Sequence, residues 1–261
     1  MGKDPESDGA DGNAIRDTVI QHYNRLAPQY FKLYEGRTRL THFYRIRQTR
    51  VLNFLDEVAQ GGRVLEVGCG PGYMAENIVV KDLQYSGVDI SAGMIKLCKE
   101  HYSKIDTAQF SVGDIQHLAF SPSCFDAVLC IGALEYAPHE ETAIKEMTRV
   151  LKAGGVYVLS GINKWSPYNL WDRLLYRKIT GRRPAAIVHE YHDEKQYREL
   201  LARSDLRIKD IAYFDFDVFF PPLDRRLANI AVTCSEHLES CSRGWLRTLG
   251  NGFLIKAVKA I

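Results

Sequence analysis

The sequence predicts an α/β fold built on a doubly wound, mostly parallel sheet of seven strands, with helices before the sheet and a helical lid inserted after the fifth strand. Short segments of branched apolar residues alternate with segments of helical periodicity between residues 63 and 160. This alternation is typical of parallel strands joined by crossover helices. A glycine-rich turn follows the first strand, at the place where open α/β sheets bind their ligands.

Each expected strand is a short apolar run bounded by polar or glycine residues, and the last strand is expected to close the sheet in the antiparallel sense. The seven ranges are 63–67, 83–88, 108–112, 124–130, 156–160, 206–220 and 253–258.

The helices are predicted from apolar side chains spaced three and four residues apart and from residues that begin or end a helix. Ser91 and Asp193 are expected N-caps, and Gly154-Gly155 is expected to end a helix. Besides a helix that follows Ser91, the expected ranges are 14–34, 39–59, 140–152, 193–203 and 227–241.

The chain divides into a short tail and one domain. Residues 1–13 are acidic and glycine-rich with almost nothing to bury, so we expect them to be a disordered tail. Residues 14–261 are long enough to form a single α/β domain with a full apolar core. Within that domain, residues 161–192 and 221–250 depart from the α/β alternation and are expected to be lid or substrate-binding insertions.

Charge and cysteine content limit the classes of protein to consider. The chain has 34 basic and 32 acidic residues, which gives no general affinity for nucleic acid. It has no run of about 18 apolar residues, so no membrane span is expected. Its six cysteines include no C-x-x-C pair, which favours reduced thiols in a cytoplasmic protein over a disulfide framework or a zinc site.

The turn after the first strand carries glycine at alternate positions, Gly68-x-Gly70-x-Gly72, with Glu66 just ahead of it. Glycine lets the backbone approach a ligand where a Cβ would clash. Dinucleotide-binding proteins instead use G-x-G-x-x-G and aim a helix N-terminus at a pyrophosphate. Glu66 would repel a pyrophosphate but would attract a ligand that carries an amine and a sulfonium cation.

An aspartate follows each of the next two strands. Asp89 comes after residues 83–88 and suits the two hydroxyls of a ribose, because a carboxylate only accepts hydrogen bonds. The alternative is that Asp89 only caps the following helix. Asp114 comes after residues 108–112 and suits an exocyclic amine. A glycine turn and two such acids at the ends of successive strands indicate a site for an adenosyl ligand.

In order and spacing, these motifs and the segments 125–129 and 149–155 resemble those of the class I S-adenosylmethionine-dependent methyltransferases. The resemblance is strongest to the small-molecule group that includes the ubiquinone- and menaquinone-type enzymes, and it covers residues 23–155. It implies S-adenosylmethionine as cofactor. It also implies transfer of a methyl group to an oxygen, nitrogen or carbon atom of a small or lipid-like molecule.

The resemblance implies which residues bind the cofactor. The glycine turn and the acid ahead of it would meet the methionine portion, the two later aspartates would meet the ribose and the adenine, and apolar side chains would enclose the adenine ring. The implied residues are Tyr23, Tyr30, Glu66, Gly68, Gly70, Asp89, Ile90, Met94, Asp114, Ile115 and Ile131.

Residues 23–31 resemble the N-terminal segment that these enzymes fold over the cofactor. Its two tyrosines, Tyr23 and Tyr30, are expected either to close on the methionine end or to pack in the core. Three arginines of the next helix are candidates for the methionine carboxylate, the alternative being solvated side chains: Arg45, Arg47 and Arg50.

The chemistry asks little of the protein, because a sulfonium methyl is already activated and orientation in a dry pocket supplies much of the rate. A general base is needed only if the nucleophile loses a proton. A surface or supporting role is the alternative for each polar residue considered, and no metal is expected. The candidate catalytic residues are Tyr30, Tyr136, His139, His189 and His192.

Two other function classes stay open at this point. One is a nucleic-acid (RNA) methyltransferase, although the fourth strand ends in residues 131–135 without the Asn/Asp-Pro-Pro-Tyr motif of base-amine enzymes. The other is a non-catalytic adenosyl-binding scaffold. The mixed apolar and basic residues of 161–192 suit contact with a membrane surface, or else their tryptophans pack on the core. Neither the substrate nor the oligomeric state follows from the sequence.

Overall fold

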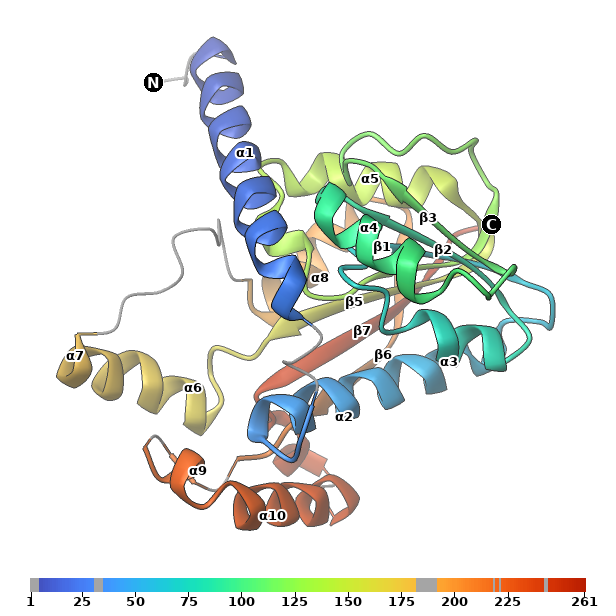
Figure 1. Ribbon diagram of the computed structural model, residues 1–261. Helices are drawn as coiled ribbons and strands as arrows, with labels where there is room; N and C mark the ends of the chain where they lie inside the picture. The colour runs from blue at the N-terminus through green and yellow to red at the C-terminus, as the bar shows by residue number, and fades with distance from the viewer. Residues whose placement is uncertain (1–4, 31–34, 182–191, 218, 221, 242–243) are drawn as a thin grey trace.

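The structure is a computed structural model, and it describes residues 5–30, 35–181, 192–217, 219–220, 222–241 and 244–261. These residues form a seven-stranded sheet in the order β3-β2-β1-β4-β5-β7-β6 (Figure 1). Strands β1 to β5 run parallel, and β7 lies antiparallel between β5 and β6. The predicted mostly parallel α/β sheet is therefore confirmed. The strands are β1 (Arg63–Val67), β2 (Gln84–Asp89), β3 (Ala108–Val112), β4 (Phe125–Cys130), β5 (Leu151–Ile162), β6 (Leu206–Phe214) and β7 (Gly252–Lys259).

The helices follow the strands in the expected alternation, and the two expected N-caps are confirmed. Ser91 accepts from the backbone N–H of Met94 over 3.1 Å, and Asp193 forms a capping box with Gln196. The helices are α1 (Pro5–Tyr30), α2 (Arg39–Phe54), η2 (Leu55–Glu57), α3 (Ala75–Val80), α4 (Ala92–His101), η3 (Leu134–Tyr136), α5 (Glu140–Val150), α6 (Pro167–Trp171), η4 (Asp172–Tyr176), α7 (Arg177–Thr180), α8 (Glu194–Ala202), α9 (Leu223–Arg226), α10 (Ala228–Cys241) and η5 (Gly244–Leu249).

Two apolar clusters cover the two faces of the sheet. One joins alternate residues of the strands to α5 and α8, for example Val128 with Ile144 and Leu201. The other joins the opposite residues to α2, α3 and α4, for example Leu129 with Phe54. Because neighbouring residues of β4 are buried on opposite faces, the strand reads as a continuous apolar run in the sequence. The buried centre holds the carboxyl ends of β1, β2 and β4 in fixed positions.

The first helix begins earlier than the sequence indicates. α1 starts at Pro5, so residues 5–13 are helical and not the disordered tail expected for 1–13. Gly12 is buried, and a Cβ placed on it would lie 3.4 Å from the Cβ of Pro138. This close approach lets α1 pack against the segment that follows η3 at Gly12.

Two strands also differ in length from expectation. β5 begins at Leu151 and ends at Ile162, because the glycine pair expected to end a helix lies inside an extended strand instead. β6 ends at Phe214, well before residue 220, because Asp215 takes a left-handed conformation with φ of 64°. The helix expected over 39–59 is α2, which ends at Phe54 and continues as η2.

The chain leaves the sheet twice to form helical extensions. α6, η4 and α7 follow β5, while α9 and α10 follow β6, and both groups lie at the same end of the molecule (Figure 1). The ring of Trp171 stacks on that of Phe220 with centroids 5.6 Å apart, which joins the two extensions. Among the helices of the described residues, none is both long and apolar enough to cross a membrane.

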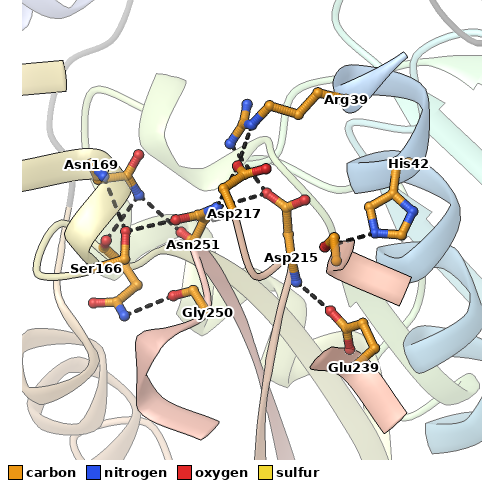
Figure 2. A network of polar contacts seen from close by, with 11 residues as sticks. Arg39, His42, Ser166, Asn169, Asp215, Asp217, Glu239, Gly250 and Asn251 are labelled. Carbon is orange, nitrogen blue, oxygen red and sulfur yellow. Dashed lines mark hydrogen bonds and ion pairs between the residues drawn. The ribbon is translucent and has the colours of Figure 1, made fainter. Parts of the chain in front are cut away.

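A buried polar network anchors these extensions to the sheet (Figure 2). Asp215 is fully buried and receives hydrogen bonds from Arg39 at 3.2 Å and from the side chain of Asn251 at 3.1 Å. Asn251 in turn accepts from Ser166, the N-cap of α6, over 2.8 Å. The Arg39 guanidinium lies 3.9 Å over the ring of Tyr168. The network therefore fixes the base of the first extension to α2 and β7.

Candidate active site

The glycine turn after β1 has a backbone conformation that requires glycine. Gly68, Gly70 and Gly72 have φ of 71°, 53° and 80°, values that other residues rarely adopt. A Cβ on Gly68 would lie 2.2 Å from the Cβ of Ala133, so that position requires glycine on steric grounds as well. No protein atom lies within 4 Å of a Cβ placed on Gly70, and Gly70 lines a cavity.

Asp89 ends β2 and connects the turn to the next helix. Its Oδ2 accepts from the backbone N–H of Gly70 and its Oδ1 from that of Ser91, each over 2.8 Å. Burial raises the pKa of Asp89, while the same two N–H groups lower it. Ser91, and not Asp89, is the N-cap of α4, and each oxygen of Asp89 keeps a further lone pair for a ligand.

Asp114 lies just past β3 and is held from two sides. It forms an ion pair with Arg16 of α1 at 3.2 Å and accepts from the backbone N–H of Gln116 over 2.9 Å. Its side chain is 12% exposed. Helix α1 therefore reaches over the ends of β2 and β3 and contacts the acid expected to meet the adenine.

Glu66 is a buried acid at the end of β1, where only 4% of its surface is exposed. Its carboxylate accepts a hydrogen bond from the hydroxyl of Tyr85. Burial raises the pKa of Glu66 to about 7, although Tyr85 and Arg47 act in the opposite direction. A buried carboxyl that ionises near neutral pH is well suited to a cationic amine, which would stabilise its charged form.

A cavity of about 320 Å³ opens above the carboxyl ends of the strands and brings most of the predicted residues together. Met94 is the exception among the implied cofactor-binding residues. Its side chain is fully buried on the inner face of α4. It is absent from the described residues that line the cavity, so its expected contact with adenine is not found. The predicted residues that do line the cavity are Tyr23, Tyr30, Glu66, Gly68, Gly70, Asp89, Ile90, Asp114, Ile115 and Ile131.

Tyrosines of α1 close one side of this cavity. The rings of Tyr23 and Tyr136 meet edge to face with centroids 5.5 Å apart, and Tyr30 lies 6.4 Å from Tyr23. Burial raises the pKa values of Tyr23 and Tyr30 far above the ordinary value for tyrosine. Both phenols are therefore neutral near pH 7, and both line the cavity.

The structure separates the three candidate arginines. Arg47 lines the cavity, with its guanidinium 5.0 Å over the ring of Tyr44. Arg50 forms an ion pair with Glu239 at 2.9 Å, and Arg45 is exposed on the outer side of α2. The helical phase of α2 thus directs one cation of the three into the cavity.

The catalytic candidates are also separated. His192 and Tyr136 line the cavity, while His139 is exposed beside the N-terminus of α5. His192 Nε2 contacts a carboxylate oxygen of Glu140, the first residue of α5. His189 lies outside the described residues. Within the part of the chain that the structure describes, no group of three or more histidine, cysteine or acidic residues is arranged to hold a metal ion.

Two acidic residues near the cavity were missed by the sequence reasoning. Glu135 lines the cavity, and burial raises its pKa. Its position just past a parallel strand was a usable signal, because such positions face the ligand in open α/β sheets. Glu140 carried no such signal, since its partner His192 is 52 residues away in the sequence and only the fold brings them together.

Comparisons with known proteins agree with this site. A family model described as a methyltransferase domain matches residues 65–159. A ubiquinone biosynthesis O-methyltransferase of Paracidovorax citrulli is 29% identical over 203 residues, which are 74% of this chain and 82% of that protein. A 2-methyl-6-phytyl-1,4-hydroquinone methyltransferase of Synechocystis is 33% identical over 131 residues, 48% of this chain and 41% of that protein.

Solved structures share the fold. The magnesium protoporphyrin IX methyltransferase of Synechocystis, determined with bound S-adenosylhomocysteine, aligns with a TM-score of 0.66 at 16% identity and covers 94% of this chain and 99% of its own. A cyclase, SpnF, aligns with a TM-score of 0.64 at 18% identity over 93% of this chain and 95% of its own. The motifs of the glycine turn, their placement around one cavity and these relatives identify the chain as an S-adenosylmethionine-dependent methyltransferase that is similar to the class I enzymes acting on small molecules.

Proposed function

We propose that this enzyme transfers the methyl group of S-adenosylmethionine to a ring hydroxyl of an apolar small molecule of the phenol or quinol type. The observation that carries this proposal is the lining of the cavity beyond the glycine turn. Aromatic and aliphatic side chains of three different elements meet there, namely Phe43 and Tyr44 of α2, Ile162 of β5 and Phe214 of β6. Such a wall suits a flat, apolar ring. Relatives named for quinone-related substrates support the same choice.

The residues present fit the cofactor. Asp89 has acceptor capacity for the ribose hydroxyls, and Asp114 with the Ile115 backbone would meet the adenine edge. The buried acid Glu66 provides a counter-charge for the methionine amine. Arg47, which lines the same cavity, provides one for the methionine carboxylate.

When bound, the cofactor supplies a methyl group that is already activated by its sulfonium centre. The chain's part is to align the acceptor with that methyl and to exclude water. Helix α1 and its tyrosines cover the cavity from one side, and Phe43 and Phe214, whose ring centroids are 5.2 Å apart, form a wall on the other.

The helical extensions support contact with a membrane surface, where such an apolar substrate would dissolve. We call their exposed apolar residues the arm surface. Trp165 is 60% and Ile179 is 77% exposed, which favours membrane contact for these two side chains, whereas Trp171 packs on Phe220 as the packing alternative expects. Basic side chains of the same segment, such as Arg173 and Lys178, are placed to interact with anionic headgroups. The arm surface comprises Trp165, Trp171, Leu174, Leu175, Ile179, Leu223, Leu227 and Ile230.

An acceptor panel tests the proposed reaction. The purified enzyme is incubated with S-adenosylmethionine and, separately, an alkylated catechol, an aniline and a tertiary carbon acid, and S-adenosylhomocysteine release and product mass are measured. We expect an O-methylated catechol at a rate well above those of the other acceptors. Methylation of the aniline or of carbon in preference to the hydroxyl would contradict the proposal.

A further inference from the structure

Four acidic side chains line the cavity, and Glu135 differs from the other three in its contacts. Each of the three receives a hydrogen bond or an ion pair from another residue, and the proposed function assigns each to the cofactor. Glu135 accepts a hydrogen bond from its own backbone N–H and has none from any other described residue. It is only partly buried, so a ligand in the cavity can reach its carboxylate. The three acids with partners are Glu66, Asp89 and Asp114.

Glu135 lies at the end of the cavity where the methionine portion of the cofactor is expected. It belongs to η3, just past the carboxyl end of β4. The positive charge of Arg47, proposed to hold the methionine carboxylate, lowers the pKa of Glu135, and the charge of Glu135 raises the pKa of Tyr23. Charges shift pKa values in this way over short distances, so these three side chains are neighbours. The acid without a partner is therefore near the expected site of the chemistry.

We propose that Glu135 is the general base of methyl transfer and accepts the proton of the acceptor hydroxyl; this inference rests on the proposed function. A carboxylate only accepts hydrogen bonds, so a hydroxyl that enters the cavity is the kind of donor that it needs. The phenols of Tyr23 and Tyr30 line the same cavity, but they are neutral near pH 7 and hold their own protons.

The reaction step balances in atoms and charge. The proton of the acceptor hydroxyl passes to a carboxylate oxygen of Glu135, and the electron pair of the hydroxyl oxygen forms the new bond to the methyl carbon. The carbon–sulfur bond breaks with its electron pair left on sulfur. The products are a methyl ether, S-adenosylhomocysteine and the neutral acid of Glu135. One positive and one negative charge disappear, and a cavity of low polarity favours their loss.

The surroundings of Glu135 define how the reaction depends on pH. Burial raises its pKa and Glu140 acts in the same direction, while Arg47 acts against both. A raised pKa makes the carboxylate a better proton acceptor, and kcat should fall as the pH is lowered through that pKa. The ionisable groups that act on Glu135 or adjoin it are Tyr23 of α1, Arg47 of α2, Cys130 of β4, Tyr136 of η3 and Glu140 of α5.

The first test observes the carboxyl group itself and needs no turnover. The side-chain carboxyl carbons of the ¹³C-glutamate-labelled enzyme are followed by NMR with S-adenosylhomocysteine bound, and the Glu135 signal is assigned by its loss in Glu135→Gln. We expect it to titrate above the ordinary pKa of 4.5. It should also shift when the alkylated catechol binds, and less with the dimethyl ether of that catechol, which has no hydroxyl proton. A Glu135 signal that saturating catechol leaves unchanged would overturn the proposal.

The second test compares two acceptors of different acidity. With the alkylated catechol, Glu135→Gln should lower kcat about a hundredfold, while S-adenosylhomocysteine affinity stays within about threefold of wild type. With 4-nitrocatechol, whose hydroxyl ionises near neutral pH without a base, the loss of kcat should be at most about tenfold. Glu141→Gln is the matched control, because Glu141 is exposed on α5 and pairs with Arg203.

Each outcome of the second test has a distinct meaning. An equal loss of kcat with both catechols would show a structural role for Glu135 and overturn its role as the base. A loss confined to cofactor affinity would assign Glu135 to the methionine amine instead. An unchanged kcat in Glu135→Gln would overturn the base while leaving O-methylation intact. If the wild type methylates neither catechol, the proposed acceptor is wrong, and the role of Glu135 as its base is wrong with it.

Discussion

Asp89 accepts the backbone N–H of Gly70 over 2.8 Å, so the acid expected to hold the ribose also holds the glycine turn. The glycine turn and Asp89 are therefore structurally coupled through this hydrogen bond. A change at either residue is expected to act on both, because the carboxylate expected to face the ribose is the one that holds the backbone of the turn.

A branched side chain at Gly70 is expected to abolish cofactor binding. The position combines φ of 53° with a place on the cavity wall, so Gly70→Val both strains the turn and fills the methionine channel. Calorimetric titration with S-adenosylhomocysteine measures the effect. Gly154→Val is the control, because Gly154 has a similar φ of 73° with no atom within 4 Å of its Cβ position and lies outside the cavity wall. Equal loss in both variants would mean that backbone strain alone is responsible.

Cofactor affinity should rise with pH up to about 7. The pKa of Glu66 is raised to about 7 by burial, and only the carboxylate form attracts a cationic amine. We therefore expect binding near pH 6 to release a proton, which calorimetry in two buffers of different ionisation enthalpy detects. In Glu66→Gln the release should vanish and the affinity should be lower. Proton release that persists in this variant would assign the effect to another group.

Glu66 also makes stability depend on pH in a defined direction. Its pKa is about 7 in the folded protein against an ordinary value of 4.5, so the folded state binds the proton more tightly. Its contribution is fully present below pH about 4.5 and is lost as pH rises through about 7. The difference in free energy of unfolding between wild type and Glu66→Gln, from urea titrations at pH 5 and 8, should accordingly be larger at the lower pH. A difference that is the same at both values would contradict this.

Arg16 is expected to contribute to closure of α1 over the adenine end. It is 44% exposed and pairs with Asp114 at 3.2 Å, so Arg16→Ala should weaken S-adenosylhomocysteine binding only a few-fold. Asp114→Ala should cost about tenfold or more, because it also removes an acceptor for the adenine. Arg25→Ala, on the exposed side of the same helix, serves as the control. A larger effect from Arg16→Ala than from Asp114→Ala would mean that closure of α1 contributes more to cofactor affinity than the contact of Asp114 with the adenine.

The arm surface is expected to bind anionic vesicles at low salt. Flotation with phosphatidylglycerol-containing and with neutral liposomes measures this binding, and surface attraction is least screened at low ionic strength. The double variant Trp165→Ser, Ile179→Ser should lose it. Val80→Ser is the control, because Val80 is 84% exposed on α3, outside the arm surface. Failure of the wild type to float with anionic vesicles would remove the membrane contact from the account.

Sequence reasoning was most successful where the chemistry is local. The glycine turn and Asp89 lie within one β-α-β unit, so their spacing alone predicts that they meet, and the structure places them 2.8 Å apart. It was less successful where a helix must be oriented. Met94 and Arg47 both lie on helices, where one residue corresponds to about 100° of rotation. The sequence did not show that Met94 is buried away from the residues that line the cavity, and it left three arginines of α2 undistinguished.

Contacts between distant segments could not be predicted at all. The pairing of Glu140 with His192 and that of Arg39 with Asp215 join residues 52 and 176 positions apart. Nothing in the local pattern of either residue indicates its partner, because the sheet order that brings them together is a property of the whole fold. The early end of β6 could not be predicted for the same reason. Asp215 turns the chain there, and its partner Arg39 is distant in the sequence.

The most direct test of the account is a calorimetric titration of S-adenosylhomocysteine into wild type, Asp89→Ala and Asp126→Ala. Asp126 is a matched aspartate at the opposite end of the sheet, where it pairs with Lys152. We predict a wild-type dissociation constant well below millimolar. Asp89→Ala should lower the affinity about ten- to a hundredfold, since charged hydrogen bonds are worth about 1.5–3 kcal/mol. Asp126→Ala should change the affinity little. Wild-type binding no tighter than millimolar, or tighter binding of NAD, would contradict the assignment of this cavity to the methyl donor.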